Sequence, residues 1–177
     1  MLFSKMKILI EKEFENLVEA GRKKSEAHYF RLGHLNYGFS SAYLKAVCQN
    51  ILDSVLEIEN QLKSLMHKYG LQEKSAFAKI KRELDSNRNK LYSKANLLFE
   101  THFKPYSDKG KFYDEIKGKF ISELSGVNYK SNIELNSILL ELQQNKNIFF
   151  RIRKWCLDHM LAFLSIIVGI LSLILQI

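Results

Sequence analysis

Two arginine–histidine pairs, each with five intervening residues, are the residues of this chain that could do chemistry on a nucleic acid: Arg22 with His28, and Arg153 with His159. A histidine can transfer a proton near neutral pH, and an arginine can hold a phosphate. In an unbroken helix, however, residues six apart lie about 120° apart around the axis, so neither pair would converge on one phosphate. Arg22 escapes this objection only if Gly21 interrupts its helix. We therefore predict no catalytic residues.

Metal and thiol chemistry have weaker support in the sequence. Glu26, His28 and His34 could in principle bind a metal ion, but the chain contains no His-Glu-x-x-His motif and no Cys/His cluster with zinc spacing. Cys48 and Cys156 form neither a metal-type pair nor a disulfide framework, and a cytosolic domain would keep them reduced. We predict no metal and no cofactor.

The most specific pattern is a stripe of small and polar residues near the C-terminus. It consists of Ala162, Ser165, Gly169, Ser172 and Gln176, at intervals of three, four, three and four. In lipid, small residues permit close helix approach, and hydroxyl and amide groups prefer a partner or water to acyl chains. The stripe predicts a homo-oligomeric interface that could line a wet pore. The alternative is an incidental mixture, because serine and glycine are common in membrane helices.

The stripe lies in a segment that resembles a membrane anchor. Residues 160–177 contain no charged side chain. As a helix they would rise roughly 27 Å, close to the ~30 Å of bilayer hydrocarbon. Arg151, Arg153, Lys154 and Trp155 precede them, which is typical of the cytoplasmic membrane interface. We therefore predict a transmembrane segment over 155–177 with the N-terminal domain in the cytosol; the alternative is a buried C-terminal helix of a soluble bundle.

Length and charge limit the other partners. The chain has 177 residues and a formal net charge of +8. Without the C-terminal segment, about 155 residues remain, which is enough for one compact domain. The densest cationic cluster adjoins the predicted membrane segment, so we expect anionic lipid as its partner. Residues 73–94 carry seven cations and three acids, an ordinary ratio for a solvated helix, and we do not expect direct nucleic-acid binding.

Apolar periodicity predicts an all-α protein. A first helix covers about residues 3–20, and extends to about 31 if Gly21 does not break it; residues 32–39 form a loop. A second helix is capped by Ser40 or Ser41 and ends at Gly70. A third covers about 73–103 and breaks before Pro105, so the two should lie antiparallel. The second helix carries the most regular apolar seam: Leu44, Cys48, Ile51, Val55, Ile58, Leu62, Leu65 and Tyr69.

The C-terminal third of the chain is expected to contain two further helices. A short one covers about Tyr113 to Leu124, and Gly126 and Asn128 mark a turn. Ser131 and Glu134 match a capping box, from which the last helix would run without a break into the membrane. These boundaries predict a cytosolic helical domain over 1–130, a long helix leading to the membrane over 131–154, and the transmembrane segment over 155–177.

This layout resembles a known family. A cytosolic bundle of four to five helices, an Arg-x5-His pair and a single span are similar to the small membrane accessory protein with a divergent HEPN domain that is encoded beside the RNA-targeting effector of type VI-B CRISPR systems. The similarity carries the HEPN motif onto Arg153 and His159, or onto Arg22 and His28. Lysines follow both arginines, where HEPN ribonucleases usually have asparagine or aspartate.

The resemblance implies an HEPN-like bundle and a ring-shaped homo-oligomer that forms a pore in the bacterial inner membrane. Such a pore would depolarise the host and strengthen anti-phage defence without cutting RNA, and the CRISPR effector would be a functional partner. Two alternatives remain at this stage. One is a membrane-tethered, metal-independent HEPN-type ribonuclease, and the other is a tail-anchored adaptor that binds another protein.

Overall fold

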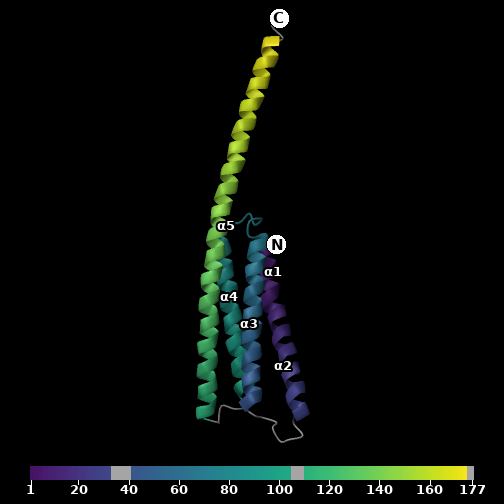
Figure 1. The fold of residues 1–177 in the computed structure, drawn as a ribbon, viewed down its shortest axis with the longest axis vertical. Coiled ribbons are helices and arrows are strands. Elements are labelled where there is room, and N and C mark those ends of the chain that lie inside the picture. Colours follow the sequence, from purple (N-terminus) through teal and green to yellow (C-terminus); the bar gives the residue numbers. More distant parts are fainter. Residues whose placement is uncertain (33–40, 105–109, 175–177) are drawn as a thin grey trace. The chain divides into compact units, whose positions relative to one another are not determined.

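The computed structural model describes the backbone of residues 1–32, 41–104 and 110–174 (Figure 1). Side chains are described for the same ranges except residues 29–32, 41, 161–163 and 169–174. Within these ranges the protein is all-α, with four long helices and no strand. The predicted fold class is confirmed at this level. The predicted loop at 32–39 lies almost wholly outside the described residues.

The first long helix consists of α1 (Leu2–Ile8), the π-helical turn η1 (Leu9–Glu13) and α2 (Phe14–Leu32) in series. It therefore continues through Gly21, which agrees with the longer of the two predicted helices, the one that ends near residue 31. One apolar stripe is buried along it, which contains Leu2, Met6, Ile10, Phe14 and Val18. A π turn disturbs the regular carbonyl pattern, and here Lys94 of helix α4 (Phe77–Phe103) donates to the Ile10 carbonyl at 3.3 Å.

Helix α3 (Ser41–Tyr69) supplies the centre of the core. The predicted seam is confirmed over six of its eight positions, since the side chains from Leu44 to Leu62 are buried, whereas Leu65 and Tyr69 are half-buried. A tight turn follows, in which the Gly70 amide donates to the Met66 carbonyl at 2.8 Å. Helix α4 (Phe77–Phe103) then begins four residues later than predicted and lies beside α3 (Figure 1).

The predicted break in the last third of the chain is wrong. Helix α5 runs from Lys111 to Ile174, and Gly126 and Asn128 lie inside it. Ser131 is buried within this helix and caps nothing, while Glu134 forms an ion pair with Lys63 of α3. Packing explains the difference, because Phe120, Leu124, Leu135 and Leu139 keep one buried face in register across the glycine.

Stacked aromatic rings join α4 to the first part of α5. The Phe99 ring lies 4.3 Å from the Phe103 ring and 4.5 Å from the Phe120 ring, with near-parallel planes in both cases. All three rings are buried. Aromatic pairs in this geometry add to the burial of their area, so the cluster fixes the end of the bundle where α4 stops and α5 starts.

The chain forms two compact units, Met1–Leu139 and Leu140–Ile177. The first contains the bundle core described above. In the part of the chain that the structure describes, no helix combines the length and the apolar character needed to cross a membrane. The transmembrane segment predicted for 155–177 includes residues 175–177, which lie outside the described residues. It also includes residues 161–163 and 169–174, of which the structure describes the backbone but not the side chains.

Candidate functional site

The Arg22 side chain is already engaged by acidic neighbours on its own helix. Its Nε and Nη2 donate to the Glu19 carboxylate at 2.9 and 2.8 Å, and its Nη1 donates to Glu26. These contacts raise the pKa of Arg22, and the guanidinium lowers the pKa of Glu19 to about 2. His28 lies on the same helix with an exposed side chain. The structure therefore holds Arg22 in an ion-pair cluster instead of directing it, with His28, at a phosphate.

Gly21 does not interrupt the helix but allows α3 to approach it. The Asn50 amide of α3 donates to the Gly21 carbonyl at 3.0 Å and to the Ser25 hydroxyl at 2.7 Å. A Cβ on Gly21 would lie 3.1 Å from the Asn50 side chain, so glycine suits this contact. The condition under which Arg22 and His28 could have converged is thus not met.

His102, near the end of α4, is a half-buried histidine whose pKa is also affected by the charges of the Arg22 cluster. Burial lowers its pKa below the usual 6.5, and the positive charge of Arg22 lowers it further, while Glu19 and Glu26 oppose the shift. His102 and Arg22 are eighty residues apart in the sequence, so their coupling is a product of the tertiary fold. No spacing motif could have revealed it.

This shift predicts a pH dependence of stability. Because the His102 pKa is lowered in the folded state, the unfolded chain takes up the proton first as the pH falls below about 6.5. Stability should therefore be complete well above pH 6.5 and should decrease as the pH falls through and below this value, towards the lowered pKa of the folded state. A His102→Gln variant should lose part of that decrease, measured as the apparent Tm across the pH series. The control is His67→Gln, at an exposed position of α3, which should keep the full decrease.

Arg153 and His159 occupy exposed positions of the second unit. The His159 Nδ1 lies 2.8 Å from the Trp155 carbonyl oxygen one turn earlier, and the Trp155 and His159 rings are in tilted contact, with centroids 4.0 Å apart. These contacts orient His159 along its own helix. Arg151, Lys154 and Trp155, for which the sequence predicts a membrane interface, are also exposed.

The predicted oligomer stripe can be placed only in part. Ser165 is exposed on α5. The side chains of Ala162, Gly169 and Ser172 lie outside those that the structure describes, and Gln176 lies outside the described residues altogether. The stripe therefore stays a prediction.

No group of three or more His, Cys, Asp or Glu side chains with metal-binding geometry occurs among the described residues. Glu26 is hydrogen-bonded to Arg22, and His34 lies outside the described part of the chain. Both cysteines are free: Cys48 is buried, which raises the pKa of its thiol to about 12, and Cys156 is exposed. A raised pKa leaves Cys48 as an inert thiol.

A buried ion pair that the sequence did not predict lies at the centre of the bundle. The Arg88 Nε donates to the Glu59 carboxylate at 2.9 Å, and the side chains are 7% and 0% exposed. The Tyr92 hydroxyl donates to the same Glu59 oxygen at 2.9 Å, whereas the second oxygen, Oε2, is buried without a hydrogen bond. Burial and the charge of Glu59 raise the pKa of the Tyr92 phenol.

The remaining donors of Arg88 tie α4 to α5. Its Nη2 donates to the Asn128 carbonyl and to the Asn128 side-chain oxygen at 3.0 and 2.8 Å, and its Nη1 donates to the Asn132 side-chain oxygen at 3.2 Å. A signal for this site existed in the sequence: Asn87 and Arg88 stand where the apolar period of α4 requires a core residue. In the sequence, however, Asn87 looks like a mere interruption of the apolar period of this helix.

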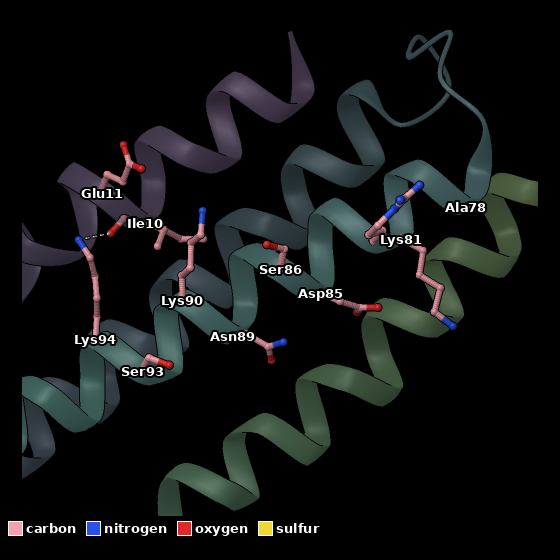
Figure 2. A pocket seen from close by; sticks show the side chains of 11 residues that line it. Ile10, Glu11, Ala78, Lys81, Asp85, Ser86, Asn89, Lys90, Ser93 and Lys94 are labelled. Atoms are coloured by element: carbon pink, nitrogen blue, oxygen red, sulfur yellow. Dashed lines mark hydrogen bonds between the residues drawn. The ribbon is translucent and has the colours of Figure 1, made fainter.

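Two depressions lie on either side of the exposed face of α4. The larger, with a volume of about 940 Å³, runs between α4 and the η1 region and includes Lys81, Lys90 and Lys94 (Figure 2). The smaller, about 450 Å³, lies between α4 and α5 beside Arg88. Lys81, Asp85 and Asn89 of α4 line both.

Comparison with known proteins gives no relative for this chain: no family model, curated protein or solved structure matches it significantly. Its function must therefore be inferred from the residues and from their geometry.

Proposed function

We propose that this protein is a membrane-bound, self-associating helical protein that permeabilises or depolarises the membrane in which it assembles. The observation that carries the proposal is the apolar surface of the second unit. Phe149, Phe150 and Trp155 are 73%, 70% and 61% exposed, and the described apolar side chains from Leu157 to Met160 and from Leu164 to Val168 are exposed as well. Apolar side chains of this size in such density mark a surface that something else covers.

A lipid bilayer is the partner that fits this surface best. Arg151, Arg153 and Lys154 lie among the exposed aromatic residues, which suits the headgroup region with its anionic lipids and its preference for tryptophan. The sequence beyond them, 160–177, contains no charge that would oppose insertion. We place the bundle on the cytoplasmic side, where flanking cations concentrate.

Self-association follows from the composition of this segment. Apolar helices gain no hydrophobic energy by leaving lipid for one another, so close packing at small residues must supply the association. Ala162, Gly169 and Ser172 provide such a stripe, and Ser165 and Gln176 add polar groups that could face water. The similarity to the accessory protein of type VI-B CRISPR systems is the sole support for a role in anti-phage defence.

The test compares two substitutions by leucine on opposite sides of the segment, of which only one adds bulk. Gly169→Leu adds bulk where backbones should meet, so it should raise the dissociation constant of the oligomer about tenfold or more. The oligomer in detergent and any depolarisation in cells should therefore be lost. Particle mass in nonionic detergent and a membrane-potential dye give the two readings. Ile167→Leu is the matched control and should leave both intact. Equal behaviour of the two variants would favour the tail-anchored adaptor instead.

A further inference from the structure

The smaller depression between α4 and α5 has the character of a binding pocket, and it is independent of the proposed membrane function. Arg88 forms its floor, and its walls come from two helices within the first compact unit. The side chains that line it are all polar: Lys81, Asp85 and Asn89 on α4, and Asn128, Asn132 and Asn136 on α5. We refer to it as the asparagine pocket.

The floor of the pocket fixes how two of these asparagines are oriented. An arginine side chain can only donate hydrogen bonds, so Asn128 and Asn132 must both present their Oδ1 atoms to Arg88. Asn136 also donates its Nδ2 to the Asn132 oxygen, at 3.3 Å. The Nδ2 groups are consequently the parts of the Asn128 and Asn132 side chains that remain for a ligand, and both side chains are exposed.

The charges of the pocket favour a ligand that accepts hydrogen bonds and carries negative charge. The Arg88 charge is balanced from behind by Glu59, which is fully buried. Within the described part of the chain, Lys81 has no ion-pair partner, so its ammonium is available at the rim. Asp85 is the one carboxylate among the lining residues. The pocket thus offers two amide donors and one ammonium against a single acidic side chain.

We propose that the asparagine pocket binds an oxyanion of the phosphate-ester type. A phosphate offers several strong acceptor oxygens, which match a set of converging N–H donors. The volume of about 450 Å³ lies within the range of pockets that hold small ligands. The ester could be a free metabolite or the headgroup of a lipid, since the recognised group is the same in both.

The experiment uses the full chain in nonionic detergent and measures binding by calorimetry. The probes are inorganic phosphate, glycerol 3-phosphate, and mixed micelles containing phosphatidic acid. Lys81→Met should weaken binding about tenfold, because of the two cations that line the pocket it removes the one that has no ion-pair partner among the described residues. Asp85→Asn should tighten it by removing the repelling carboxylate.

Lys90→Met is the matched control, because Lys90 is an exposed lysine of the same helix that lines only the larger depression. It should bind like the unaltered protein. Binding of phosphate and glycerol 3-phosphate supports a soluble ligand, and binding of the micelles alone supports a lipid headgroup. Absence of binding to all three probes, or equal losses in the Lys81 and Lys90 variants, would overturn the proposal.

Discussion

Replacing Arg88 by alanine should lower the free energy of unfolding by about 3–5 kcal/mol. The Glu59 carboxylate is 0% exposed and, among the residues that the structure describes, would keep only the Tyr92 hydroxyl as a hydrogen-bond donor. A buried charge without compensation is among the most destabilising changes known for single substitutions. The loss of the bonds from Arg88 to Asn128 and Asn132 would add to the effect by loosening α4 from α5. Denaturant unfolding followed by circular dichroism measures it.

Two further variants separate the buried charge from general damage to the helix. Arg88→Met combined with Glu59→Leu removes both charges together and should recover most of the lost stability, because apolar replacements of a buried pair are often neutral. Lys94→Ala breaks a partly exposed pair with Glu15 and a long hydrogen bond to the Ile10 carbonyl, and should cost about 1 kcal/mol. If Arg88→Ala cost no more than Lys94→Ala, the Glu59–Arg88 pair would not be a central element of this fold.

Ending the chain after Arg153 should move the protein from the membrane pellet to the supernatant. The removed residues contain the long uncharged run 160–177, and each apolar residue transferred to lipid contributes several tenths of a kcal/mol to insertion. The change in partitioning should therefore span orders of magnitude. Fractionation of cells after a high-salt wash measures it, because salt releases proteins that are held only by lysine and arginine contacts.

Point substitutions sharpen this prediction without removing residues. A charge at the centre of the segment, Ile167→Asp, should reduce membrane retention, since an ionised side chain is costly inside hydrocarbon. Leu97→Asp changes an exposed apolar residue of α4 in the same way and should leave retention unchanged. A truncated chain that still pellets after the salt wash would show that another part of the protein holds it to the membrane.

The sequence by itself determined the all-α class and most of the helix positions, because apolar periodicity reports directly which face of a helix must leave water. The seam from Leu44 to Leu62 was found in this way. It also identified the uncharged C-terminal segment, since a missing charge is visible without any structure. Local breaker signals misled at Gly126 and Ser131, where the packing of Phe120, Leu124 and Leu135 keeps α5 intact.

Only the tertiary structure decided which polar residues meet. Glu59, Arg88 and Asn128 come from three helices and are separated by 29 and 40 residues, and no spacing rule links them. The same holds for His102 and the Arg22 cluster. A charge can be buried only where the packed helices deliver partners for it, and those partners are set by how the helices align in space. The sequence thus determined where the helices lie along the chain, and helix packing decided which of their polar side chains form a site.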